Sequence, residues 1–399
     1  MIIELRGMDM NIKHEVEILK DELNSIRRDF HQYPELGFQE FRTSEIIASY
    51  LEKCGLEVKR NVAKTGVVGL LRGGQLGKTI LLRSDMDALP VHEENDIPFK
   101  SVNDGIMHAC GHDGHMAMLM IAAKILAKHR DRIKGNVKFV FQPNEEDAGA
   151  EIMIGEGILE NPQVDAALGI HLWSPIETGK IGIVPGPIMA SSYYFKLVVH
   201  GKGGHGGAPH TAIDPISCAV NIMQTTQTMQ TKELDALEPT IITFCKINCG
   251  TSPIIIPERI EIEGSLRCLH EGTEEVQKRF EQIIKSICEA HRTTYELNFK
   301  CGNILLSNDP NMTELVKRVG ADALKKENIL DSKISVMLGE DFAEFCVRVP
   351  SAFYFVGIAN KEKGTDYPHH HPRFNIDEEA LSIGVEMHVL GALAFLHKD

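Results

Sequence analysis

Two short apolar runs on either side of a helical segment constrain the fold of this chain more than any other feature. The runs are Lys78–Ser84 and Asn136–Gln142, and a similar run follows at Ala166–Leu172. Continuous apolar runs of this length, bounded by turn-forming or polar residues, are typical of strands buried on both faces of a sheet. A strong helical segment, residues 115–129, separates the first two runs. This order predicts a βαβ unit with a parallel strand pair.

The middle of the chain has a different pattern. Strand-like and helical runs follow one another as strand, helix, strand, strand, helix, strand, which is the ferredoxin-like arrangement. Their combined length suits a self-contained domain. The expected strands are 194–201, 240–247, 259–269 and 294–300, and the expected helices are 213–229 and 274–291.

The two ends of the chain share α/β character. Residues 12–54 are expected to be helical, and helix 310–326, strand 351–358 and helix 377–395 follow the middle region. The sequence therefore predicts a compact domain, residues 191–302, inserted into a larger α/β domain that is formed by residues 1–190 and 303–399.

Composition limits the classes of function. The 399 residues are 43% hydrophobic and 25% charged, as in a soluble globular protein of about two domains. The net charge of −14 disfavours a nucleic-acid partner, because phosphate recognition needs a basic face. The chain has neither a polybasic patch for a membrane surface nor an unbroken apolar run of roughly 18 residues, so we expect no membrane partner.

The number and spacing of the cysteines indicate in which cellular compartment the protein is expected. The nine cysteines are dispersed and form no CxxC pair. Residues 1–11 are polar and lack the apolar core of a signal peptide. We therefore expect a reduced, cytoplasmic protein. Cys245 and Cys249 lie in a strand-like run and are expected to be core thiols rather than metal ligands.

Residues 108–115, which read HACGHDGH, are dense in metal-ligating side chains. Two glycines make this run a tight loop rather than a helix. On an extended loop Cys110 and His112 would leave the backbone on the same side. A thiolate and an imidazole that converge there suit zinc or a similar divalent ion. The alternative is a redox or structural cysteine with surface histidines nearby.

Further candidate ligands follow the predicted strands. Side chains at the strand ends of an α/β sheet project into a common crevice, so these groups are candidates for one site. The candidates are Asp85 and Asp87 after the first strand, Glu145 and Glu146 after the second, His171 near the end of the third, and the tract His369–His371.

The adjacent residues Glu145 and Glu146 could have two different functions. In an extended segment two adjacent carboxylates point to opposite sides, so one can bind a metal ion while the other takes a proton from water. The alternative is a solvated surface turn, which the preceding buried strand disfavours. His369–His371 offers a further ligand or, alternatively, a flexible surface tract. His171 taken alone would suit a satisfied core histidine.

The glycine-rich run Gly201–His210, GKGGHGGAPH, leaves the first strand of the predicted inserted domain. It matches neither GxxxxGK[ST] nor GxGxxG before a helix, so nucleotide binding is not expected. The loop can instead present His205 to a distant site.

The chain resembles one metallohydrolase family in a series of runs that cover nearly its whole length. They are RSDMDALPV, MHACGHDGH, FQPNEED, GIHLW, GKGGHGGAPH, MLGEDFAEF and YPHHHPRF. The family comprises aminoacylases, hippurate hydrolase, auxin-conjugate amidohydrolases, N-acetyldiaminopimelate deacetylases and some carboxypeptidases. The resemblance implies a zinc-peptidase-like α/β catalytic domain with an inserted ferredoxin-like α+β lid, and a homodimer or larger homo-oligomer that forms through the lid.

The same resemblance implies an activity. The expected reaction is metal-dependent hydrolysis of an amide bond in a small N-acyl amino acid. Carboxypeptidase or dipeptidase action on the same scaffold is the alternative, and a catalytically silent metal-binding protein is a third possibility that no residue favours.

The resemblance also implies the members of the site. Glu145 matches the family's general base, and His205 matches a lid histidine that stabilises the oxyanion in the partner subunit's site. Asp87 matches a residue that orients a ligand, and Asp85 lies where related di-zinc peptidases carry a ligating histidine. Two divalent ions, Zn²⁺ or Mn²⁺ with Co²⁺ or Ni²⁺ as alternatives, would be bound by Cys110 as the bridge together with His112, Glu146, His171 and His370.

One departure from the family pattern concerns substrate recognition. The family often carries an asparagine within Gly-Thr-x-x-Asn-x-Ile-Pro, and Ile254 stands in its place within Gly250–Pro257. Isoleucine cannot hydrogen-bond a substrate. Arg267 remains as a candidate clamp for a carboxylate, because a guanidinium suits bidentate binding. A cross-strand surface charge is the alternative role for Arg267.

Overall fold

The computed structural model describes residues 10–397, so most of the expectation for residues 1–11 lies outside the described part. The chain divides into two compact units. Unit 1 comprises Met1–Ile188, Ser307–Ser335 and Asp341–Asp399, and unit 2 comprises Met189–Leu306 and Val336–Glu340. The domain limits predicted from the sequence, 191 and 302, leave Val336–Glu340 outside the inserted domain.

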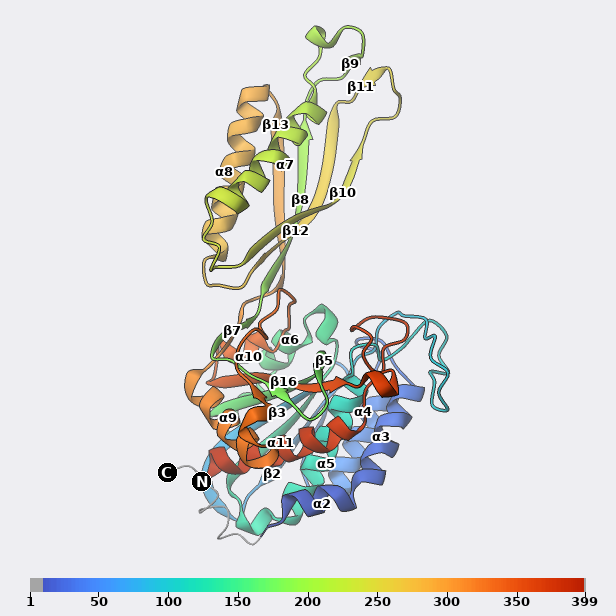
Figure 1. Ribbon diagram of the computed structural model, residues 1–399, viewed down its shortest axis with the longest axis vertical. Coiled ribbons are helices and arrows are strands. Elements are labelled where there is room, and N and C mark those ends of the chain that lie inside the picture. The colour runs from blue at the N-terminus through green and yellow to red at the C-terminus, as the bar shows by residue number, and fades with distance from the viewer. Residues whose placement is uncertain (1–9, 398–399) are drawn as a thin grey trace. The chain divides into compact units, whose positions relative to one another are not determined.

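An eight-stranded sheet forms the centre of unit 1, in the order β1-β2-β4-β3-β5-β16-β6-β15 (Figure 1). Strand β3 pairs in parallel with β4 and β5, and β5 pairs in parallel with β16. The predicted parallel pair is therefore confirmed. The outer strands β1 and β2 are antiparallel, which makes the sheet mixed. The bounds are β1 Glu57–Val62, β2 Gly66–Arg72, β3 Gln75–Asp85, β4 Lys134–Gln142, β5 Ala166–Glu177, β6 Ile181–Gly182, β15 Ile329–Leu330 and β16 Ser351–Ala359.

The central strands are buried along most of their length, as expected for a sheet covered on both faces. Six helices of the described residues share one hydrophobic core with this sheet. They are α2 Ile12–Ile18, α3 Lys20–Gln32, α4 Phe41–Lys53, α5 His112–Lys128, α9 Pro310–Leu324 and α11 Glu379–Leu396. Two further helices, α6 Gly149–Gly155 and α10 Ala343–Cys346, contact β4 and β16.

The helical segment predicted for residues 12–54 is broken into α2, α3 and α4. The main break follows α3, where Pro34 disfavours helical backbone in the preceding residue. Leu36 then forms a bridge with Ala88, next to the end of β3. The break therefore brings the N-terminal helices to the edge of the sheet where candidate site residues gather.

Helix α11 bears on the expectation that no helix of this chain spans a membrane. Its mean hydropathy of 1.5 over 18 residues is sufficient, by length and composition, to cross a membrane. The sequence suggested no such stretch because Glu386 and His388 interrupt its apolar run. However, 78% of the stretch is buried inside the protein, and α11 packs against α5 and α9. This burial is what a core helix requires.

Unit 2 contains a four-stranded antiparallel sheet in the order β10-β12-β8-β13. Helices α7 (Pro215–Lys232) and α8 (Thr273–His291) lie along one face of it (Figure 1). The element order and the strand order together confirm the predicted ferredoxin-like arrangement. The strand bounds are β8 Ser191–His200, β10 Thr240–Cys249, β12 Arg259–Cys268 and β13 Thr294–Asn303.

Two cysteines of β10 lie differently from the prediction. Cys245 and Cys249 are exposed and are not core thiols. Strand β10 lies at the edge of its sheet, and a bulge between Phe244 and Lys246 shifts its register. Within β10 only Ile242 is buried, so the apolar run overstated how much of this edge strand faces the core.

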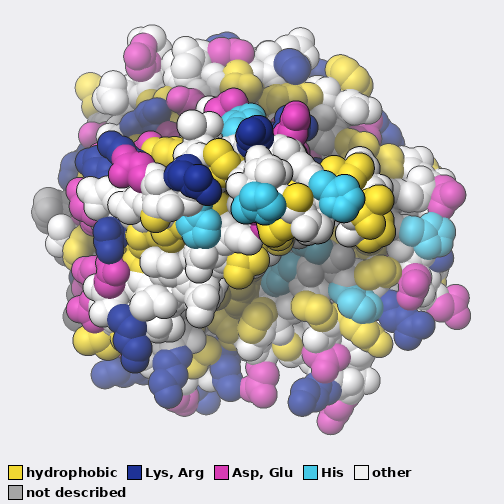
Figure 2. Space-filling model, turned by 90° about the horizontal axis from the view of Figure 1, so that it is seen from above, with side chains coloured by type: hydrophobic (Ala, Val, Ile, Leu, Met, Phe, Trp, Pro, Cys, Tyr) yellow, Lys and Arg dark blue, Asp and Glu magenta, His cyan; other side chains and the backbone are white. Residues whose placement is uncertain are grey.

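On the face in Figure 2, basic and acidic side chains are interspersed and form no large basic patch.

Candidate metal centre

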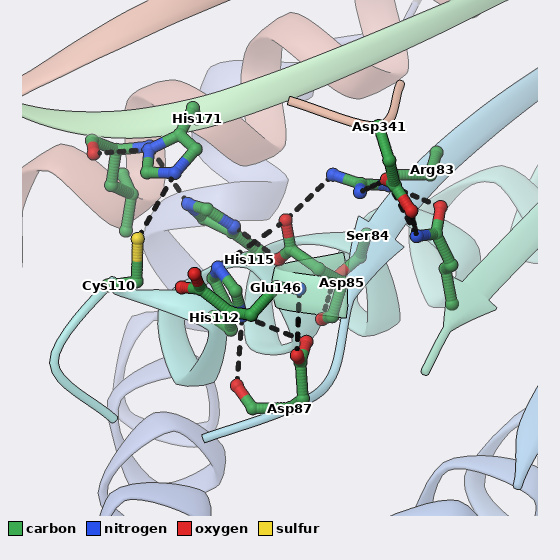
Figure 3. A network of polar contacts seen from close by, with 12 residues as sticks. Arg83, Ser84, Asp85, Asp87, Cys110, His112, His115, Glu146, His171 and Asp341 are labelled. Atoms are coloured by element: carbon green, nitrogen blue, oxygen red, sulfur yellow. Dashed lines mark hydrogen bonds and ion pairs between the residues drawn. The ribbon is translucent and has the colours of Figure 1, made fainter. Parts of the chain in front are cut away.

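The candidate centre in unit 1 lies where parallel strands end. Asp85 is the last residue of β3, and Glu145 begins the 3-10 turn η2 (Glu145–Asp147) just after β4. His171 lies in β5, and His112 is the first residue of α5 (Figure 3). Because β3, β4 and β5 run in the same direction, their carboxyl ends meet at one edge of the sheet.

The five predicted ligands lie together in two overlapping groups. One group is Cys110, His112 and His171, and the other is Cys110, Glu146 and His370. Within each group the candidate ligand atoms lie within 4.8 Å of one another. The Cys110 Sγ is 3.5 Å from His171 Nε2, and His370 Nε2 is 3.3 Å from Glu146 Oε1. Cys110 belongs to both groups, which is the arrangement that a bridging ligand requires.

Two of the imidazoles have their tautomers set by backbone carbonyls. His171 Nδ1 donates to the carbonyl of Leu172 at 2.7 Å, and His112 Nδ1 donates to the carbonyl of Asp87 at 2.9 Å. Both rings therefore keep Nε2 for another partner. The Nε2 of His112 is buried and has no hydrogen-bond partner. Such an orphaned nitrogen costs about 1–3 kcal/mol unless a ligand satisfies it, so the site fits a metal ion.

Left-handed backbone conformations shape the centre. His370 has a φ of 64°, and its N–H donates to the carbonyl of Ala109 at 2.8 Å, which ties it to the 108–115 loop. Asn144 and Ala148, on either side of the turn that carries Glu145, have φ values of 53° and 65°. Non-glycine residues in this region cost about 1–3 kcal/mol each, and such strain gathers at functional sites.

Two local expectations are wrong. The 108–115 run is not extended at its ligands, because Gly111, with a φ of 90°, turns the chain and His112 already belongs to α5. Glu145 and Glu146 lie in a 3-10 turn, and their carboxylates come within 4.8 Å of each other and of His112 instead of pointing to opposite sides. Left-handed residues flank this turn on both sides, and residue types alone did not indicate them.

Anionic groups favour positive charge in the centre. Hydrogen bonds to Cys110 and Glu146 raise the pKa of His370 to about 10. Burial opposes the charged form of His112, but nearby carboxylates, Asp85 first, hold its pKa well above its usual range. Burial raises the pKa of the Cys110 thiol. A bound divalent cation would supply the positive charge that these anionic groups stabilise.

Asp87 lies behind the candidate ligands. Its Oδ2 accepts the backbone N–H of Glu146 at 3.1 Å, and its Oδ1 is 3.3 Å from His112 Nδ1. These contacts are consistent with the predicted role of orienting a ligand.

Two predicted site residues belong to unit 2. His205 lies in β9 (Gly204–His205), which pairs with β11 (Ile255–Ile256), and its exposed ring accepts the N–H of Gly207 at 3.0 Å. Ile254 is also exposed. Arg267 donates to the carbonyl of Met337 at 3.0 Å. The roles of His205 and Arg267 in catalysis and substrate binding stay predictions.

A buried polar network at the sheet edge was not predicted. Arg83 donates to Asp85 at 2.7 Å and to Asp341 at 2.8 Å, and Gln142 donates to Asp341 at 2.7 Å. Arg83 is 1% exposed. An arginine inside an apolar strand run could have indicated this network. A buried arginine requires an anionic partner, so acidic groups had to lie nearby.

Comparison with known proteins decides the family. The sequence model of Peptidase family M20/M25/M40 matches residues 81–393. This chain belongs to that family. It is 41% identical over 329 residues to an N-acyl-L-amino acid amidohydrolase of Geobacillus stearothermophilus, across 79% of this chain and 88% of that protein. It is 39% identical over 393 residues to thermostable carboxypeptidase 1 of Saccharolobus solfataricus, across 97% of this chain and 98% of that protein.

A solved structure agrees with the sequence comparison. The fold is similar to that of the Bacillus subtilis YXEP protein, described as a dinuclear metal binding peptidase of the M20 family, with a TM-score of 0.84 and 30% identity. The match covers 96% of this chain and 100% of that one. The predicted family and fold class are thus confirmed, and this M20 protein is an enzyme that hydrolyses amide bonds with the help of metal ions.

Replacing Cys110 by alanine removes the sulfur that both ligand groups share. We expect the Cys110→Ala variant to lose both ions, measured as metal content by plasma mass spectrometry after dialysis against a trace-metal buffer. Cys245→Ala, at an exposed thiol of β10, is the matched control and should keep both ions. A Cys110→Ala protein with the metal content of the wild type would contradict a shared ligand.

Proposed function

We propose that this protein hydrolyses the amide bond of N-acyl amino acids, with Glu145 as the general base. The observation that carries the proposal is the overlap of two ligand groups at Cys110 beside the buried carboxylate of Glu145. The amidohydrolase of Geobacillus stearothermophilus, at 41% identity, supports this substrate class. The same relative supports a small-molecule substrate, and the net charge of −14 disfavours a nucleic-acid partner.

The proposed chemistry assigns a separate task to each group. Two divalent ions held by the five ligands would supply Lewis acidity to water and to the scissile carbonyl. Glu145, 7% exposed, takes the proton of the attacking water and then gives it to the leaving amine, which contributes about 10²- to 10⁴-fold in rate. Asp87 holds Glu146 and His112 in place through the contacts described above. The mixed sulfur, nitrogen and oxygen ligands suit Zn²⁺ or Mn²⁺, with Co²⁺ and Ni²⁺ as alternatives.

Glu145→Gln tests the general base. The amide keeps the shape of the side chain but cannot accept the proton of water, so we expect kcat to fall about 10²- to 10⁴-fold while metal content stays at the wild-type level. Glu151→Gln removes the same charge from an exposed position of α6 and should leave kcat unchanged. Full turnover by Glu145→Gln would refute the assignment of the base.

Carboxypeptidase or dipeptidase action is the second candidate, favoured by the 39% identity with thermostable carboxypeptidase 1 over 97% of this chain. A panel of N-acetyl, N-benzoyl and dipeptide substrates that share one C-terminal residue separates the two activities. We expect kcat/KM to be higher for the acyl amino acids in metal-supplemented buffer, and a chelator to abolish the activity. A consistent preference for the dipeptides would replace the leading proposal with the second.

We further propose a homodimer that forms through unit 2 and places His205 in the partner's site. The exposed edge strand β10 and the exposed Ile254 and Ile255, at 62% and 53%, support an interface. A donor such as His205 aimed at the developing oxyanion would lower the barrier by roughly 3–4 kcal/mol.

Mixed subunits test the dimer and His205 together. When His205→Ala and Glu145→Gln proteins are unfolded, mixed in equal amounts and refolded, we expect activity to recover to about one quarter of the wild-type value, because half of the dimers are mixed and each has one intact site. Each variant refolded alone is the control. Monomers in sedimentation equilibrium, or no recovery from the mixture, would contradict the arrangement.

The cytoplasm is the proposed location, because a ligand thiol such as Cys110 needs reducing surroundings or protection by a bound metal. Recovery of the protein from an exported fraction of its source cell would contradict this location.

A further inference from the structure

One buried peptide group, that of Leu172 in β5, is bonded by three histidines. Its N–H donates to His115 Nε2 at 2.8 Å. Its carbonyl accepts from His171 Nδ1 at 2.7 Å and from His369 Nε2 at 2.9 Å. Leu172 is fully buried. The candidate ligand His171 is therefore connected to two histidines that have no task in the proposed chemistry.

The direction of these hydrogen bonds defines the protonated nitrogens. A backbone N–H only donates, so the Nε2 of His115 accepts without a proton. A carbonyl only accepts, so His171 Nδ1 and His369 Nε2 carry protons. His171 then presents Nε2 toward the Sγ of Cys110, 3.5 Å away. The direction of that nitrogen depends on the plane of the Leu172 peptide group.

His115 is held from its other side by a buried ion pair. Its Nδ1 donates to Asp85 Oδ1 at 2.5 Å, and Arg83 donates to Asp85 Oδ2 at 2.7 Å. Figure 3 shows Arg83, Asp85 and His115 in a row that leads toward His171. Asp85, His112 and His115 also meet the spacing of a metal-binding group. However, both oxygens of Asp85 are already engaged, which makes Asp85 an anchor for His115.

The ring of His369 is held by aromatic neighbours and by a hydroxyl group. Its ring lies 4.6 Å from that of Trp173 and 5.1 Å from that of Phe374, measured between centroids. Its Nδ1 is 3.3 Å from the hydroxyl of Ser174. The Leu172 peptide is thus held at its N–H by His115 and at its carbonyl by a packed imidazole.

We propose that His115 and His369 are positioning residues, which fix the Leu172 peptide so that His171 is held ready to bind its metal ion. The inference rests on the proposed metal-dependent function. If the peptide tilts, the carbonyl turns away from His171 Nδ1 and the ring loses its fixed direction. Removing a partner that orients a metal-binding histidine typically weakens metal affinity about 10- to 100-fold.

Two variants at His115 and two at His369 separate the positioning of the Leu172 peptide from simple packing. In His115→Gln the side-chain oxygen lies near the position of Nε2 and can accept from Leu172, whereas in His115→Asn the amide lies near Nδ1 and reaches only Asp85. In His369→Gln the amide nitrogen can still donate to the Leu172 carbonyl, and in His369→Phe the ring packing is kept without a donor. Each conservative variant therefore preserves one named contact.

Titration of the metal-free protein with Co²⁺, followed by visible absorption and chelator competition, is the measurement. We expect two Co²⁺ ions in the wild type, and one of them about 10- to 100-fold weaker with an altered absorption band in His115→Asn and His369→Phe. His115→Gln and His369→Gln should remain close to the wild type. His388→Gln, which removes a buried imidazole of α11 with no bond to Leu172, is the control and should bind both ions normally.

Two results would overturn the proposal. One is unchanged Co²⁺ binding in both His115→Asn and His369→Phe. The other is an equal loss at both ions in all variants, His388→Gln included, since that indicates packing alone. Failure of the proposed function has a different signature, because the wild type itself would then not take up two Co²⁺ ions, and that result would overturn both proposals.

Discussion

The gathering of acidic groups with imidazoles at one edge of the sheet is the constraint on which the metal centre of unit 1 depends. Cys110, 8% exposed, lies with Glu146, and the neighbouring His112 lies with the buried carboxylates of Asp85 and Glu145. Burying several acidic groups together is unfavourable unless positive charge accompanies them. Part of that charge comes from Arg83, which engages Asp85 directly. The rest of the positive charge comes from protonated imidazoles or from bound metal ions. Metal binding and proton release are therefore coupled in such a centre.

Regular elements supply two of the candidate ligands, and loops and turns supply the others. Strands β3, β4 and β5 bring their carboxyl ends to one edge, where a ladder of backbone hydrogen bonds fixes the starting point of each loop. His171 lies in β5 and His112 begins α5. Among the remaining ligands His370 has left-handed backbone, as does Gly111 between Cys110 and His112. Peptide groups then orient the imidazoles, those of Asp87 for His112 and Leu172 for His171. A site of this kind tolerates little displacement, because metal ligands need defined directions as well as distances.

The periodicity and composition of the sequence were sufficient to predict the main strands and helices. The apolar runs around 78–84 and 136–142 are strands of a parallel pair, and the inserted unit has the predicted order of helices and strands. Failures came where an element is interrupted or lies at an edge. Pro34 divides the predicted N-terminal helix, and Cys245 is exposed in the edge strand β10, although its apolar neighbours suggested burial. A count of apolar positions contains neither the effect of a proline nor the place of a strand in its sheet.

Residue types and motif order indicated which side chains belong to the site, but not how they are held. The five candidate ligands were named from the sequence, and the structure brings them together. The 3-10 turn at Glu145 and the left-handed conformation of His370 had no recognisable signal. The supports behind the ligands were also missed, because the role of His115 depends on a peptide group far along the chain at Leu172. Such contacts follow from the fold and not from local sequence.

The central claim is that one sulfur holds two cations. Crystals of the metal-loaded protein, with diffraction data collected on both sides of the absorption edge of the bound metal, test it most directly. A shared sulfur predicts two anomalous peaks on either side of Cys110 Sγ, one next to His171 and the other next to Glu146 and His370. A single peak, or peaks that Cys110 does not touch, would contradict it.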